Sequence, residues 1–288
     1  MGTTITLSSQ NINGFARNQT YVKELCDTFP NSIRAFQEHW MKSPLKRHLG
    51  VNKLRQVHDD FDGWGTSAMR DDMENHVRVG RLFGGTGYIW NKKFSLAIKP
   101  RLEYKHDRVT VIELNDKRGK ILLINAYMPY FSTNQLDTQL AIYVDTLGFI
   151  ESIMEMNDGC SFILLSDLNC NSYKENHPFS VLIRDLMQKR NLVSTYDFME
   201  NFDPAASWSR KSAGQNRTES RTLIDFILVS NSISSRISNV RISDYEKEED
   251  KEGKERVWSC QMYDVSYCTA ILFICMCVYV CMCLCMYV

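Results

Sequence analysis

The chain alternates short apolar runs with stretches in which apolar residues recur every three or four positions, as far as about residue 230. The short runs predict strands, because four to eight apolar residues bounded by turn residues are typical of a buried strand. They cover residues 5–12, 32–38, 88–90, 109–114, 121–127, 162–165 and 223–229. The periodic stretches predict amphipathic helices at 20–29, 136–154 and 178–190. Strands separated by helices, with hairpin-like pairs among them, indicate a mixed α/β fold with helices outside.

The pattern changes twice after residue 242. Residues 246–256 (EKEEDKEGKER) form a charge run of the kind found in solvated linkers, so we place a domain at 1–245 and a charged linker at 246–264. Residues 265–288 form a Cys/Met-rich tail without charge, long enough for a membrane-spanning helix. The near-alternation of Cys, Met, Val and Tyr is also what translation of a simple nucleotide repeat produces. Both interpretations, a transmembrane helix and an artefact, stay open.

The composition is that of a globular protein, with 288 residues, 44% hydrophobic and 24% charged, and a formal net charge of zero. Zero net charge excludes a bulk positive field for nucleic acid, but it does not exclude a local basic groove. Only three of the ten cysteines precede residue 260, and their scatter suits a reducing compartment. The N-terminus has no basic and apolar signal-peptide pattern, and a membrane location would follow only from a genuine tail helix.

Polar residues stand at the carboxyl ends of several predicted strands. Members of two pairs lie two positions apart, which points their side chains to the same side of the chain. Taken singly, each has an ordinary structural interpretation as a turn former, a helix cap or a solvated strand end. Asp225 is the exception, because it lies within an apolar strand, where an unpaired carboxylate is costly to bury. The full set is Asn11, Asn13, Glu38, Asp167, Asn169 and Asp225.

The order and wording of these segments resemble the endonuclease/exonuclease/phosphatase family, which includes apurinic endonucleases and deoxyribonuclease I. Over residues 4–245 the supporting motifs are Q-N-I-N-G-F, F-Q-E-H-W, G-G-T-G-Y-I-W, I-N-A-Y-M-P, L-L-S-D-L-N, S-W-S-R and L-I-D-F-I-L-V-S. Within the family the wording is most similar to the endonuclease domain of non-long-terminal-repeat retrotransposons. The resemblance implies a four-layer α/β/β/α sandwich, in which two mixed sheets are flanked by helices. It also implies an intracellular location, nuclear or cytoplasmic.

The resemblance also implies a role for each matching residue. Glu38 and Asn13 match metal-binding positions for Mg²⁺, with Mn²⁺ as an alternative, and a hard cation prefers such oxygen ligands. Asp167 matches the acid that activates the attacking water, and Asn169 the amide that orients it. The remaining positions are the phosphate-contacting Asn11 and Tyr127, the histidine-orienting Asp225, and the substrate-contacting Trp208 and Arg210, with DNA as the implied partner.

The match fails at its C-terminal end. The family ends with Ser-Asp-His on its last strand, whereas this sequence has no histidine after His177, and Ser243-Asp244-Tyr245 comes early and lacks the imidazole. The resemblance therefore implies that the last strand is missing and that the domain lacks its catalytic histidine. Three functions stay open: a Mg²⁺-dependent DNA endonuclease of retroelement origin, a phosphatase or sphingomyelinase-like phosphodiesterase, and a non-catalytic, tail-anchored remnant.

Overall fold

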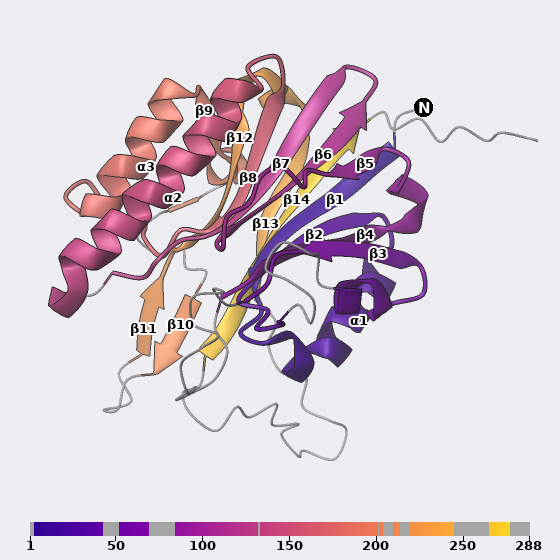
Figure 1. Cartoon of the computed structure of the whole chain (residues 1–288), viewed down its shortest axis with the longest axis horizontal. Helices are drawn as coiled ribbons and strands as arrows, with labels where there is room; N and C mark the ends of the chain where they lie inside the picture. The colour runs from indigo at the N-terminus through magenta and orange to yellow at the C-terminus, as the bar shows by residue number, and fades with distance from the viewer. Residues whose placement is uncertain are drawn as a thin grey trace, which may run out of the picture.

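A computed structural model describes residues 3–42, 52–68, 84–131, 133–200, 202–203, 210–213, 219–244 and 265–276. Two mixed β-sheets pack face to face, and helices cover their outer faces (Figure 1). The predicted linker at 246–264 lies outside the described residues. The α/β/β/α sandwich expected from the resemblance is therefore confirmed.

The first sheet has eight strands, in the order β11-β10-β14-β1-β2-β4-β3, with β13 paired to β14. Its strands are β1 (Thr3–Asn11), β2 (Ser32–Gln37), β3 (Phe61–Gly65), β4 (Thr86–Asn91), β10 (Arg210–Ala213), β11 (Glu219–Thr222), β13 (Ile237–Asp244) and β14 (Val265–Met276). Helix α1 (Gln19–Thr28) packs on this sheet through Val22 and Cys26, which join a cluster with Phe36 and Ile89.

The second sheet has six strands, in the order β5-β6-β7-β8-β12-β9. They are β5 (Ile98–Pro100), β6 (Val109–Asp116), β7 (Gly119–Tyr127), β8 (Ser161–Asp167), β9 (Leu192–Ser194) and β12 (Asp225–Ser230). Helices α2 (Leu136–Met156) and α3 (Pro178–Lys189) cover its outer face (Figure 1). Short 3-10 helices are η1 (Phe15–Arg17), η2 (Asn52–Gln56), η4 (Lys92–Phe94), η5 (Thr133–Gln135), η6 (Thr195–Phe198) and η7 (Asn231–Arg236).

The core between the two sheets is built from alternate residues of facing strands. Leu7 and Ile33 come from the first sheet, and Leu123, Ile163 and Ile227 from the second, and all are at most 1% exposed. The central strands β2 and β12 are buried along their whole length, as expected of strands covered on both faces. This inter-sheet core fixes the distance between the sheets, and so between groups at their strand ends.

The Cys/Met-rich tail differs from what its sequence indicated. Residues 265–276 form β14, which pairs antiparallel with β1 and with β13, so the strand expected to be missing has a counterpart at this place. The transmembrane-helix interpretation is corrected accordingly, since a strand hydrogen-bonded on both sides is not a helix. In the part of the chain that the structure describes, no helix is long and apolar enough to cross a membrane. Ser243 and Asp244 end β13, one strand earlier.

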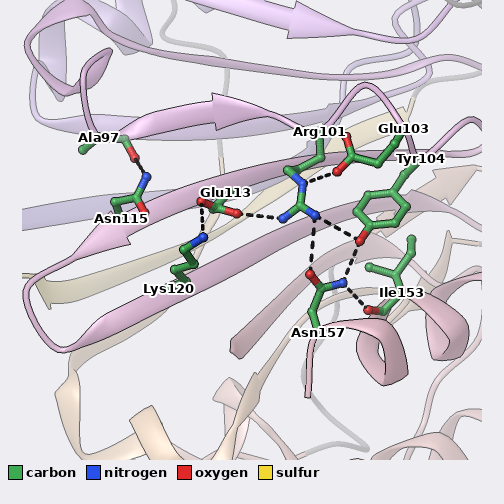
Figure 2. A network of polar contacts seen from close by, with 9 residues as sticks. All are labelled: Ala97, Arg101, Glu103, Tyr104, Glu113, Asn115, Lys120, Ile153 and Asn157. Atoms are coloured by element: carbon green, nitrogen blue, oxygen red, sulfur yellow. Dashed lines mark hydrogen bonds and ion pairs between the residues drawn. The ribbon is translucent and has the colours of Figure 1, made fainter. Parts of the chain in front are cut away.

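A polar network lies at one end of the second sheet, opposite the end at which β8 finishes. Figure 2 shows Arg101 at its centre, with Nη1 donating to Glu113 Oε2 at 2.7 Å. The Asn157 amide, at the C-terminal cap of α2, donates to Tyr104 Oη at 2.6 Å and to Ile153 O at 2.7 Å. These contacts connect the segment after β5 to the end of α2, ahead of β8.

Candidate active site

Three of the predicted site residues lie side by side at one end of the second sheet. Tyr127 ends β7, Asp167 ends β8 and Asp225 begins β12. Tyr127 is the Cα partner of Asp167 in the parallel β7–β8 pair, and Asp225 is the partner of Asp167 in the antiparallel β8–β12 pair. Both aspartates are buried, at 1% and 4% exposed. Strand register alone therefore places two carboxylates and a phenol in one row.

The first sheet meets this row through Asn11 at the end of β1. Asn11 Nδ2 donates to Asp167 Oδ2 at 2.8 Å, a contact between residues 156 positions apart in the chain. The other side of the Asn11 amide, Oδ1, accepts from the backbone N–H of Asn13 at 3.0 Å. Asn13 has a φ of 43°, a left-handed conformation that asparagine tolerates better than most residues. Both predicted asparagines thus lie where the carboxyl ends of β1 and β8 meet between the two sheets, a place that we call the mouth of the site.

Asp167 is held on its other oxygen by the turn that follows β8. The backbone N–H of Asn169 donates to Asp167 Oδ1 at 3.0 Å, and Asn169 Nδ2 donates to Met128 O at 2.8 Å. Asn169 also has positive φ, at 49°. Each oxygen of the Asp167 carboxylate thus accepts at least one hydrogen bond, which fixes the orientation of the carboxylate.

Glu38 follows β2 directly and has an unusual backbone, with a φ of 56°. This conformation is strained for a residue with a Cβ, and such strain gathers at functional sites. Trp40 Nε1 donates to Glu38 Oε2, which also faces the Gly84 N–H at 3.4 Å. Trp40 packs on Gly14, where an added Cβ would lie 2.4 Å from Trp40 Cε3. The glycine after Asn13 therefore makes room for the indole that holds Glu38.

Tyr127 connects Glu38 to Asp167. Burial raises the pKa of the Tyr127 hydroxyl, and the carboxylates of Glu38 and Asp167 raise it further, while Arg108 opposes them. Two carboxylates from different sheets therefore act on one phenol, which stays a neutral hydrogen-bond donor. The Arg108 guanidinium lies over the Tyr127 ring, 5.3 Å from its centroid, and Nη1 donates to Tyr127 O at 3.3 Å. Arg108 therefore places a positive charge beside Tyr127 and the carboxylates that act on it, those of Glu38 and Asp167.

The two predicted substrate contacts, Trp208 and Arg210, stay predictions. Trp208 lies outside the described residues. Arg210 begins β10, whose backbone pairs with β11 and with β14. The structure therefore brings together Asn11, Asn13, Glu38, Tyr127, Asp167, Asn169 and Asp225.

Sequence reasoning missed Trp40 and Arg108. Both have a local signal, because Trp40 lies two residues after Glu38, and Arg108 stands directly before the strand that pairs with β7. The Trp40 contact nevertheless depends on the turn with positive φ at Glu38 and Trp40, and the Arg108 guanidinium reaches across to the neighbouring strand. Neither contact follows from hydropathy or spacing.

The described histidines have other partners. His39 is 1% exposed, burial lowers its pKa to about 4, and its Nδ1 accepts from Met41 N at 3.0 Å. His58 contacts Asp27 at 2.9 Å, and His106 contacts Asp145 at 3.5 Å and stacks on a phenylalanine. His177 packs against Phe131. A buried neutral imidazole such as that of His39 cannot take the place of a charged catalytic histidine.

The donor atoms of the site fit a hard divalent cation. Glu38 and Asp167 supply carboxylate oxygens and the asparagines supply amide oxygens, the ligands that Mg²⁺ prefers. Within the described ranges no group of three or more His, Cys, Asp or Glu is close enough to cage a metal. Mg²⁺ does not need such a cage, since it binds through one or two carboxylates and completes its shell with water and substrate phosphate. The residues present therefore fit Mg²⁺ and do not fit a structural zinc site.

Comparison with known proteins gives a likeness at the level of the fold. No protein-family model matches the sequence, and no curated protein matches it. Among solved structures, an AP endonuclease from Leishmania major has a TM-score of 0.66 at 13% identity, over 94% of this chain and 87% of that one. The 3' phosphatase NExo from Neisseria, bound to a product DNA hairpin, has a TM-score of 0.61 at 13% identity, over 93% and 98%.

A third solved structure is relevant to the motifs that resemble retroelement endonucleases. It is the endonuclease domain of TRAS1, a telomere-specific non-LTR retrotransposon, with a TM-score of 0.56 at 10% identity, over 94% of this chain and 97% of that one. Identities this low establish architecture and not activity. The chain accordingly has the two-sheet sandwich fold of the AP endonucleases and of the retrotransposon endonuclease domain, as the motifs of its sequence implied.

Proposed function

We propose that this chain is a Mg²⁺-dependent phosphodiesterase that nicks DNA, of the type found as the endonuclease domain of non-LTR retrotransposons. The observation that carries the proposal is the 2.8 Å hydrogen bond from Asn11 to Asp167, which joins the two sheets where Glu38 and Tyr127 also lie. These residues come from four separate segments. Their meeting at one mouth is the arrangement that the sequence resemblance implies.

DNA is the substrate class that the remaining observations favour. The motifs Q-E-H-W and G-G-T-G-Y-I-W resemble retroelement endonucleases, and the NExo structure was solved with a DNA product. Arg108 supplies a guanidinium at the mouth, which suits contact with a phosphate. A phosphatase or sphingomyelinase-like activity is the alternative within the same fold.

The residues divide the work of phosphodiester hydrolysis between them. Asp167 accepts a proton from the attacking water, in an orientation that Asn11 and the Asn169 backbone fix by hydrogen bonds. Tyr127, kept protonated, donates to a non-bridging phosphate oxygen, and Arg108 offsets negative charge nearby. Glu38 and Asn13 would hold Mg²⁺, which supplies polarisation of the phosphoryl group when bound.

The absence of a histidine at the matching position lowers the expected rate of phosphodiester hydrolysis. The sequence has no imidazole after His177, and loss of one member of a catalytic set commonly costs several orders of magnitude. We therefore propose slow turnover. DNA binding without cleavage is the second candidate, and this same absence favours it.

Nicking of a supercoiled plasmid by the full-length chain tests the proposal. We expect slow Mg²⁺-dependent nicking that EDTA abolishes and that Asp167→Asn and Glu38→Gln each reduce by about 10²-fold or more. Asp185→Asn is the matched control, because this exposed acid on α3 pairs only with Lys189 in the contacts described, and its nicking rate should equal that of the wild type.

Each other result has a defined meaning. Nicking that persists in Asp167→Asn would come from a contaminant or another site, and it would refute the proposed assignment. DNA binding without nicking would establish the second candidate. Hydrolysis of sphingomyelin or an inositol phosphate, with DNA left intact, would assign the alternative substrate class.

A further inference from the structure

A layer of four polar residues crosses the otherwise apolar space between the sheets. Gln37 and Thr86 are Cα partners in the first sheet, and Thr110 and Asn125 are Cα partners in the second. Gln37, Thr86 and Asn125 are 0% exposed, and Thr110 is 1% exposed. The contacts that bridge the sheets include Gln37 Nε2 to Asn125 Oδ1 at 2.7 Å and Thr86 Oγ1 to Thr110 Oγ1 at 2.7 Å.

The direction of the amide bridge is fixed by its surroundings. Asn125 Nδ2 donates to Phe36 O at 3.0 Å and to Gly87 O at 2.9 Å, so both of its N–H groups are used on the first sheet. The oxygen of Asn125 must then accept, and Gln37 must donate. Gln37 Nε2 also donates to Ser9 Oγ at 3.0 Å. The two amides therefore make four hydrogen bonds, three of which cross between the sheets.

Every member of the bridge lies one or two residues from the candidate site. Gln37 directly precedes Glu38, Asn125 lies two positions before Tyr127, and Ser9 lies two positions before Asn11. A spacing of two residues in a strand directs side chains to the same face. The bridge is consequently the layer of side chains next to the candidate site. Its members belong to the strands that end at or just before Asn11, Glu38 and Tyr127.

We propose that the Gln37–Asn125 amide bridge positions the metal-binding carboxylate of Glu38 against Tyr127 and Asp167. The inference rests on the proposed function, since it assumes that Glu38 binds Mg²⁺. Glu38 has a strained backbone, so its carboxylate holds its place only if neighbouring contacts over-determine it. The bridge supplies such contacts from the opposite sheet, and Trp40 supplies one from the same turn.

A purely structural role would align the two sheets without affecting the metal. The two roles separate in an experiment that measures Mn²⁺ binding, by electron paramagnetic resonance, alongside the melting temperature of the same full-length variants. Gln37→Met and Asn125→Leu each remove the bridge with side chains of similar size. We expect about 10–100-fold weaker Mn²⁺ binding, the usual effect of removing a group that supports a metal ligand. The double variant should be no weaker than the worse single variant.

Asn157→Leu is the matched control. Its amide also donates two hydrogen bonds, to Tyr104 and to Ile153 O, but in the network of Figure 2, ahead of β8 and not at the carboxyl end. It should lower the melting temperature and leave Mn²⁺ affinity unchanged. Ser9→Ala removes a single acceptor and serves if a larger change prevents folding, with an expected loss of a few-fold in affinity.

The failures of the two proposals are distinguishable. Wild-type protein whose Mn²⁺ binding does not depend on Glu38 would refute the proposed metal site and the bridge together. Wild-type binding that Glu38→Gln abolishes, with Gln37→Met folded and unaltered in affinity, would refute the bridge alone. An equal loss of affinity in Asn157→Leu would also overturn it, since general destabilisation would then explain the effect.

Discussion

Removal of β14 should unfold this protein, because the strand joins three others. Truncation after residue 264 deletes all of β14, whereas truncation after residue 276 deletes only the end of the Cys/Met-rich tail and none of the paired residues. The two truncations remove sequence of similar composition. Their comparison therefore separates a strand of the fold from a dispensable tail.

The size of the effect follows from the strand pairing. β14 has seven residue pairs with β1, seven with β13 and three with β10. An antiparallel ladder has about one backbone hydrogen bond for each paired residue, and each is worth about 1 kcal/mol net. The loss of roughly 15 kcal/mol equals or exceeds the total stability of about 5–15 kcal/mol that is usual for a domain. Deletion would also leave β1, which carries Asn11, with one unpaired edge.

The assay is a thermal melt followed by circular dichroism, in reducing buffer because of the cysteines. We expect a cooperative transition for the full chain and for residues 1–276, and none for residues 1–264. A transition for residues 1–264 at the wild-type temperature would refute the reasoning, because it would show that the fold does not need β14. Flotation of the full chain with lipid vesicles, lost in residues 1–264, would support the membrane interpretation instead.

Two further predictions test the surroundings of Glu38. Gly14→Ala should lower the free energy of unfolding by about 1–3 kcal/mol in urea denaturation, because Gly14 has a φ of +100° and the new Cβ would lie 2.4 Å from Trp40. The control is Gly148→Ala, in open space on α2, which should raise the free energy of unfolding by about 0.5–1 kcal/mol. Equal effects of the two substitutions would contradict the packing of Trp40 on Gly14. His39 is held neutral, with its pKa lowered from 6.5 to about 4, so its contribution is present above pH 6.5 and is lost as the pH falls towards 4, by about 3 kcal/mol. His39→Gln should reduce this loss in urea denaturation between pH 7 and pH 4.5, and an unchanged pH dependence would show that other groups cause it.

The strands that carry the site could be read from the sequence with little error. The predicted strands at 121–127 and 162–165 correspond to β7 (Gly119–Tyr127) and β8 (Ser161–Asp167), and the predicted helix at 178–190 corresponds to α3. These elements have strong local signals, either unbroken apolar runs or a regular helical stripe. The polar residues at their ends stand out against that background, but Asp167 and Asn169 could be given roles only through the family resemblance of the motifs in their order.

Other parts of the molecule left weak local signals. Strands β10 and β11 are short and polar, and β14 belongs to the uncharged tail at 265–288, which has the length and apolar character of a transmembrane helix. Whether such a segment is a strand depends on whether an edge is available to pair with it, and β1 and β13 provide that edge. The Gln37–Asn125 bridge is equally invisible in the sequence, because its members lie 88 residues apart.

By itself, the sequence determined which strands present the candidate site residues, because apolar periodicity and strand ends are local properties of the chain; the predicted role of each residue came from the family resemblance. Only the tertiary structure decided that Asn11 meets Asp167, that Glu38 and Asp167 both act on Tyr127, and that the tail completes a sheet. Those facts depend on the register between strands and the spacing between two sheets. Both are set by contacts between residues far apart in the chain, where local preferences have no influence.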